Sequence, residues 1–375
     1  MRICPASGPG SLNKCEQKLR LKKIIAESGA NSENVFRQAE ARNLGTTFKE
    51  QAERWFEQVQ TRKRNPIKPR TADAWATALR YINPKVGETA LALVNNLAMK
   101  SFVATMASEQ KKGRPRFSAK SITNYVQIIK MVVASAINDK GDEIYPVKWN
   151  HDFIDLPVIK NQRTPTFSAE EISTIIAETQ GQHSLLYAVL AGTGLRVEES
   201  FALKVEDVKD TVIHVRHSHW RRKLYSPKSE AGTREVDLHS SLAEALHNHI
   251  GGRTSGFVFQ TRRGTPLHRS NVLRRSLHKI LAKMGREKCG FHAFRRFRVT
   301  HLRKKRVPED LVKFWIGHAP ETVTDGYSKM KEDREFRAVV AEQIGLGFHM
   351  PLVAAGLPVA HIAPSLDHAE MAVGA

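Results

Sequence analysis

Hydrophobic residues recur at helical spacing through the first part of the chain. Thr47-Phe-Lys-Glu50 has the sequence of a capping box in front of the first predicted helix. Further helices are predicted after Thr71, near residues 90–107 and from Ser118, the last with apolar residues on one broad face. The pattern therefore predicts a compact helical bundle over residues 46–143.

The pattern changes in the second part, where short β-branched runs interrupt the helical periodicity. Ser168-Ala-Glu-Glu171 is another capping box, and strands are predicted at Thr211–Val215 and, around a turn, at Lys223–Tyr225 and Arg234–Leu238. Later segments return to helical periodicity, at about 239–250, 269–284, 292–305, 308–316, 320–329 and 332–344. We expect an α+β domain over residues 165–345, with a small antiparallel sheet near its start, in a chain that is mainly α.

Three segments lack such periodicity. Residues 144–164 contain Pro146 and Pro157 and are interpreted as a linker between the two domains. Residues 1–45 are polar apart from one amphipathic stretch, and we interpret them as an appended segment. Residues 346–375 are rich in Ala, Pro and Gly and are interpreted as a C-terminal tail.

The charge of the chain indicates a polyanionic partner. Its 59 basic and 38 acidic side chains give a formal net charge of +21. The excess is spread over both predicted domains, with 17 basic and 9 acidic residues in 46–143 and 31 and 21 in 165–345. The sequence has no apolar run of roughly 18 residues, the length of a membrane span. The three cysteines form no disulfide framework, so we expect a cytoplasmic protein that binds nucleic acid.

Reactive side chains are concentrated in four segments. They are Gly192-Thr-Gly-Leu-Arg196-Val-Glu-Glu199, Ser226-Pro-Lys228-Ser-Glu-Ala-Gly-Thr-Arg234, His292-Ala-Phe-Arg295, and Ile316-Gly-His318 with Tyr327 nine residues later. Together, in this order, they resemble the tyrosine recombinase (phage integrase) family. The resemblance covers about residues 165–335 by motif, and it extends to 46–143 by pattern, since the family carries a helical core DNA-binding domain there.

The resemblance implies a catalytic set for cleavage of a DNA phosphodiester. Tyr327 would be the nucleophile and would stay joined to the DNA, which makes the step reversible without ATP. Arg196 and Arg295 would clamp the phosphate oxygens, because a planar fork of donors suits that geometry. Lys228, in the predicted hairpin, would protonate the leaving 5′ oxygen.

The remaining members of the set have supporting roles. His292 lies one helical turn before Arg295 and would either hydrogen-bond the phosphate or accept the proton of the tyrosine. His318 would be a further phosphate donor, and Glu199 would orient Arg196. The chain departs from the family at Phe294, where leucine is commoner, and at Arg296, where histidine is usual; neither position holds a proposed catalytic group.

Each motif has an ordinary structural reading when it is taken alone. Arg196 and Glu199 could form a surface salt bridge, His292 and Arg295 could belong to a solvated basic helix face, and Tyr327 could be a half-buried tyrosine. Only their joint order favours catalysis. His217 and His219 share a face of a predicted strand, but no carboxylate or cysteine with ligand spacing accompanies them. We therefore expect no metal and no other cofactor.

The resemblance also implies partners. They are double-stranded DNA with a specific recombination site, three further copies of the chain in a homotetramer on paired sites, and accessory DNA-bending proteins. A C-terminal segment that passes to a neighbour is usual in the family, and residues 332–350 are the candidate. The alternatives are a type IB topoisomerase, which relaxes DNA without a defined site, a catalytically silent DNA-binding prophage remnant, and a basic chromatin protein without sequence preference.

Overall fold

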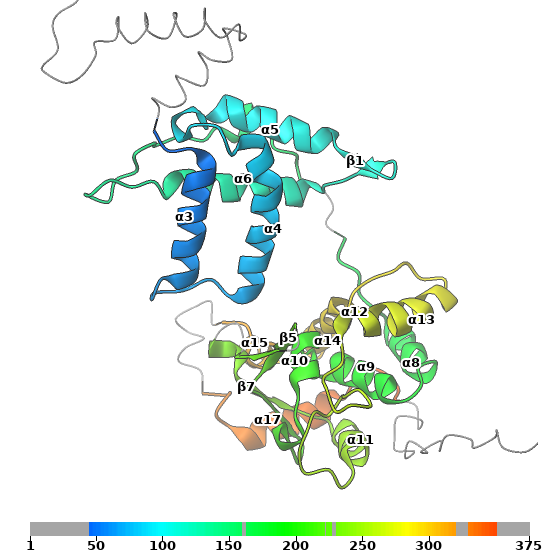
Figure 1. Ribbon diagram of the computed structural model, residues 1–375. Coiled ribbons are helices and arrows are strands. Elements are labelled where there is room, and N and C mark those ends of the chain that lie inside the picture. The colour runs from blue at the N-terminus through cyan, green and yellow to red at the C-terminus, as the bar shows by residue number, and fades with distance from the viewer. Residues whose placement is uncertain (1–44, 160–162, 222, 227–229, 320–328, 351–375) are drawn as a thin grey trace, which may run out of the picture. The chain divides into compact units, whose positions relative to one another are not determined.

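The computed structural model describes residues 45–159, 163–221, 223–226, 230–319 and 329–350. The chain divides into two compact units, Met1–Gln162 and Arg163–Ala375 (Figure 1). The fold is mainly helical with small antiparallel sheets, as the sequence predicted. No helix within these ranges is both long and apolar enough to cross a bilayer.

The first unit is a bundle of helices. Its elements are α3 (Phe48–Thr61), α4 (Pro69–Val86), a 3₁₀ turn (Leu91–Leu93), α5 (Asn96–Ser108), strands β1 (Gln110–Lys111) and β2 (Arg114–Pro115), α6 (Ala119–Ala134) and α7 (His151–Ile154). Both hydrogen bonds of the predicted capping box between Thr47 and Glu50 are present, and Ser118 caps α6 as expected. The indole rings of Trp55 and Trp75 stack at 4.9 Å between α3 and α4.

Two features of this unit differ from the sequence-based expectation. The third helix begins at Asn96 and not near residue 90, because the Asn95 side chain accepts the N–H groups of residues 97 and 98. Within the expected linker, residues 145–156 include α7, and Tyr145, Val147 and Trp149 pack against the core of the bundle. Their apolar side chains explain this packing, but the sequence of this segment has no helical or strand periodicity that would predict it.

The second unit is organised around α9 (Gln182–Thr193), which lies among other helices (Figure 1). Residues 184–193 are all buried, since a helix that is apolar on every side must be surrounded. The neighbouring helices are α8 (Ala169–Ala177), α10 (Val197–Ala202), α11 (Ser240–Ile250) and α14 (His292–Lys304). α8 starts at the capping box predicted at Ser168.

The strands of this unit pair differently from the predicted hairpin. β3 (Val208–Lys209), β4 (Val212–Val215) and β7 (Arg234–Asp237) form one antiparallel sheet, and β5 (Ser218–Trp220) pairs with β6 (Lys223–Tyr225) in another. The prediction that β6 and β7 form one hairpin is therefore wrong. β7 has an inner face that packs on the core, with Val236 buried, whereas Lys223 and Leu224 of β6 are exposed. Only β7 therefore gains from a place in the core sheet.

The C-terminal part contains α12 (Arg269–Val272), a π-helical turn (Leu273–Leu277), α13 (His278–Lys283), α15 (Glu309–Ile316) and α17 (Arg334–Ile344). α17 docks onto β7 of its own unit, with Arg337, Ala341 and Ile344 buried. The segment predicted to pass to a neighbour is therefore held in place by its own chain at least from residue 334 to residue 346, because Leu346 also belongs to the core.

Candidate active site

The first arginine of the site follows the C-terminal end of α9. Gly194 ends this helix with φ of +69°, and a Cβ there would lie 2.7 Å from Cδ1 of Ile316, so the position requires glycine. Arg196 is then the N-cap of α10. Its backbone N–H donates to Oε2 of Glu199 at 2.9 Å, and its Nη1 donates to Oε1 of Glu199 at 2.8 Å. Glu199 thus holds both the backbone and the side chain of Arg196.

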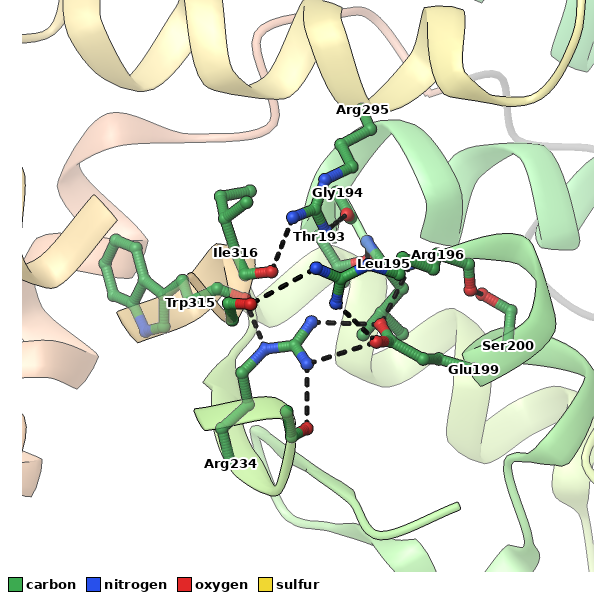
Figure 2. A network of polar contacts seen from close by, with 12 residues as sticks. Thr193, Gly194, Leu195, Arg196, Glu199, Ser200, Arg234, Arg295, Trp315 and Ile316 are labelled. Carbon is green, nitrogen blue, oxygen red and sulfur yellow. Dashed lines mark hydrogen bonds and ion pairs between the residues drawn. The ribbon is translucent and has the colours of Figure 1, made fainter. Parts of the chain in front are cut away.

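The C-terminal end of α15 collects three arginines from different elements (Figure 2). Nε of Arg234 donates to the carbonyl of Trp315 at 2.7 Å, and Nη2 of Arg295 donates to the carbonyl of Ile316 at 2.7 Å. Nη2 of Arg196 donates to the carbonyl of Gly317 at 3.2 Å.

Helix geometry explains why these arginines meet at this end. The last carbonyls of an α-helix lack partners within the helix, and the helix dipole makes this end negative. The carbonyls of Lys313 and Phe314 accept backbone N–H groups from Gly317 and His318, while those of the next three residues accept from guanidinium groups. The helix end therefore serves as the platform on which the arginines are aligned.

Arg295 is buried in this cluster, with 7% of its surface exposed. Its Nη1 donates to the carbonyl of Gly194 at 2.9 Å, which ties α14 to the end of α9. Burial, and then the positive charge of Arg196, lowers the pKa of Arg295 to about 9. The cluster therefore holds unfavourable positive charge at neutral pH, which an anion beside it would relieve.

His292 is the first residue of α14 and is exposed. Partial desolvation, then the charges of Arg295 and Arg296, lower the pKa of its imidazole. The ring is therefore neutral at pH 7, and a neutral ring can accept a proton. Arg196 contributes to the same shift, so His292 lies within the field of both predicted phosphate-binding arginines.

Arg234 belongs to the cluster although the sequence assigned it no role. It is the first residue of β7, and its side chain is 1% exposed. Its Nη2 donates to Oε2 of Glu199 at 3.0 Å, and its Nη1 donates to the carbonyl of Gly232 at 3.0 Å. The available signal was strand alternation, which places residue 234 on the same inward face as Val236.

The structure brings together four predicted members of the site: Arg196, Glu199, His292 and Arg295. His318 follows Gly317 directly and is exposed beside the platform. Lys228 and Tyr327 lie outside the described residues. Over the ranges that the structure describes, no three His, Cys, Asp or Glu side chains group as metal ligands would.

The cluster is suited to a phosphate by its charge. The guanidinium groups of Arg196 and Arg234 bind the carboxylate of Glu199, and Arg295 lies within the field of the same carboxylate, so these four side chains carry an excess of positive charge. Arg196 is the most exposed to solvent of the three arginines, since its side chain is 34% exposed. A guanidinium presents planar paired donors, the geometry that recognises phosphate oxygens. The arrangement can therefore bind and polarise a phosphodiester.

Comparisons with known proteins agree with this geometry. Residues 165–334 match the model of the phage integrase family. The integrase of Mycobacterium phage L5 is 22% identical over 272 residues, which are 69% of this chain and 70% of that protein. Tyrosine recombinase XerD of Vibrio cholerae is 28% identical over 153 residues, which cover 40% of this chain and 48% of XerD.

The fold has a counterpart among solved structures. The Tn1549 transposon integrase, in complex with transposon right end DNA, superposes with a TM-score of 0.61 at 21% identity, over 80% of this chain and 98% of that one. The matched residues 165–334 contain the whole arginine cluster as well as Lys228 and Tyr327. Residues 165–334 therefore form a domain of the phage integrase family, as the order of the motifs predicted.

Proposed function

We propose that this protein is a site-specific DNA recombinase, an integrase, that cleaves and rejoins DNA through a 3′-phosphotyrosyl intermediate on Tyr327. The observation that carries the proposal is the alignment of Arg196 and Arg295 on neighbouring carbonyls at the end of α15. The helix end lies only ten residues before Tyr327 in the sequence, counted from Gly317. The two arginines would therefore hold a phosphate at the end of the helix that precedes the nucleophile in the sequence.

The cleavage step exchanges one phosphate ester for another. The hydroxyl oxygen of Tyr327 attacks phosphorus while the bond from phosphorus to the 5′ oxygen breaks. His292, neutral at pH 7, accepts the tyrosine proton, and Lys228 gives a proton to the leaving oxygen. Arg196 and Arg295, with His318, stabilise the charge on the non-bridging oxygens. The reverse step, with another 5′ hydroxyl as attacking group, rejoins the DNA and needs no cofactor.

The proposal includes the assembly in which the reaction occurs. Exchange of two duplexes needs four strand cuts, so four copies of the chain would act on two recombination sites. The helical unit and the catalytic unit would both contact phosphates of double-stranded DNA, and basic side chains would read bases in the major groove. Accessory proteins that bend DNA, and a cytoplasmic location beside the nucleoid, are parts of the same proposal.

A nicked suicide substrate tests this function. Such DNA loses a short fragment after cleavage, so the covalent protein–DNA product accumulates and is seen on a denaturing gel. We expect an adduct on DNA from the ends of the element that carries the gene, mapped by peptide mass spectrometry to Tyr327. Wild-type protein that forms no adduct on its own site, or a Tyr327→Phe variant that still forms one, would contradict the proposal. Relaxation of any supercoiled plasmid would instead favour a topoisomerase.

The role of His292 predicts the pH dependence of cleavage. The ordinary pKa of a histidine is 6.5, and that of His292 is lowered from this value. The imidazole therefore stays mainly neutral as the pH falls from 8 to 6.5 and gains its proton at lower pH. At limiting protein concentration, where the rate reports the free enzyme, we expect cleavage to be constant over this range and to fall below it. A His292→Gln variant should be slower and should lack this acidic decline; an unchanged decline would assign it to another group.

A further inference from the structure

We propose that Arg234 is a positioning residue for the phosphate-binding arginines, which deepens the function proposed above and depends on it. Its side chain is 1% exposed, so it lies beneath the site and does not reach DNA. Its influence on the reaction must therefore pass through the groups that it contacts. Those groups lie in or next to three of the four motif segments.

The first contact is with the partner of Arg196. Arg234 and Arg196 share the carboxylate of Glu199, at 3.0 Å from Nη2 of Arg234 and 2.8 Å from Nη1 of Arg196. Burial raises the pKa of this carboxyl, but the charges of Arg234 and then Arg196 hold it below its usual value, so Glu199 is ionised. A carboxylate already neutralised by Arg234 attracts Arg196 less strongly. Arg234 therefore leaves more of the charge of Arg196 available to a phosphate.

The second contact is with the end of α15. Arg234 donates to the carbonyl of Trp315, one residue before the carbonyl that binds Arg295 and two before the one that binds Arg196. The guanidinium group also lies directly against Gly317, where an added Cβ would be 2.7 Å from Nη1 of Arg234. The buried guanidinium therefore fixes the position of the C-terminal carbonyls of α15, and with it the orientation of Arg196 and Arg295.

The third contact lies within the segment that carries the proposed general acid, to which Arg234 itself belongs. Nη1 of Arg234 donates to the carbonyl of Gly232, which lies between Lys228 and β7 in the sequence. The side chain of Arg234 thus joins its own segment to the Arg196 segment and to the end of α15 that precedes His318. A misplacement of about 1 Å in such a set costs roughly a hundredfold in rate.

The test compares Arg234→Lys with Arg253→Lys. Arg253 is a matched control, because it also donates to several backbone carbonyls, those of His249, Ile250, Phe257 and Val258, at the end of another helix. We expect Arg234→Lys to bind its site DNA within about twofold of wild type but to form the covalent adduct roughly a hundredfold more slowly at saturating protein. Arg253→Lys should cleave at the wild-type rate.

A second variant separates positioning from simple loss of structure. Because part of its effect passes through Arg196, Arg234→Lys should slow the Arg196→Ala variant by clearly less than the roughly hundredfold by which it slows wild type, since coupled residues are not additive. Multiplied effects would indicate an independent structural defect and would overturn the inference. Should Arg234→Lys fail to fold, Arg234→Gln keeps a neutral side-chain donor beside the carbonyl of Trp315, and the same slow cleavage with normal DNA binding is expected.

The outcomes separate this inference from the proposed function. An adduct with wild-type protein and an unaffected Arg234→Lys variant would overturn the inference alone. A rate that falls only in proportion to DNA affinity would also overturn it, because positioning acts after binding. Failure of wild-type protein to form any adduct would overturn the proposed function and, with it, the role of Arg234 in that reaction.

Discussion

Replacement of Arg295 by lysine is expected to slow formation of the covalent protein–DNA adduct by about a thousandfold at saturating protein, since loss of one well-placed donor alone costs 10²–10³ in rate. Arg295 uses its two terminal nitrogens to hold the carbonyls of Gly194 and Ile316, at 2.9 and 2.7 Å. A lysine ammonium is a single point of charge and cannot hold both carbonyls while it also binds a phosphate. The variant keeps the net charge, so a loss of rate reports geometry.

The neighbouring Arg296 supplies the control for this prediction. It lies on the same helix, and its Nη1 donates to the carbonyl of Pro165 at 2.9 Å, away from the cluster. Rates on a suicide substrate and affinities for the same DNA would be measured for both lysine variants. Arg296→Lys should cleave within about threefold of wild type, as expected for a substitution outside the site. Equal losses of cleavage rate in the two variants would mean that a general disturbance of α14, and not the loss of the Arg295 guanidinium, slows the reaction.

Replacement of Arg337 by methionine is expected to destabilise the catalytic unit by about 3–5 kcal/mol, the usual cost of removing one partner of a buried ion pair. Nε of Arg337 donates to Oδ2 of Asp237 at 2.9 Å, and both side chains are 2% exposed. The same carboxylate accepts the indole N–H of Trp315 at 2.7 Å. Without Arg337, the charge of Asp237 would stay buried with one neutral donor, and α17 would lose its main polar anchor.

Arg334 on the same helix gives a matched control. It binds Glu235 at 2.9 Å, but its side chain is 75% exposed, so Arg334→Met should cost at most about 1 kcal/mol. Urea unfolding of the full chain, followed by hydrogen exchange of peptides from α9, would report the catalytic unit separately from the helical one. Similar stabilities of the two variants would show that the buried pair contributes no more than a surface pair.

Most of the elements could be predicted from the sequence because their signals are local. The capping boxes at Thr47 and Ser168 each involve four consecutive residues, and both are present in the structure. Arg196 and Glu199 meet for the same reason, one turn apart at the start of a helix. The prediction was wrong where partners are distant in the chain: β7 pairs with β4 and not with β6, because only β7 has a face that packs on the core.

The sequence by itself determined the family of the second unit and the residues that we propose for the chemistry, since the order of the four motifs could be read without coordinates. It also determined the mainly helical fold, through the period of the apolar residues. Only the tertiary structure decided how the site is built. Arg234 and the carbonyl of Trp315 are 81 residues apart, and Arg295 and Gly194 are 101 apart. No local pattern encodes such pairs, because they form only when packing brings a buried strand, two helix ends and one carboxylate to the same place.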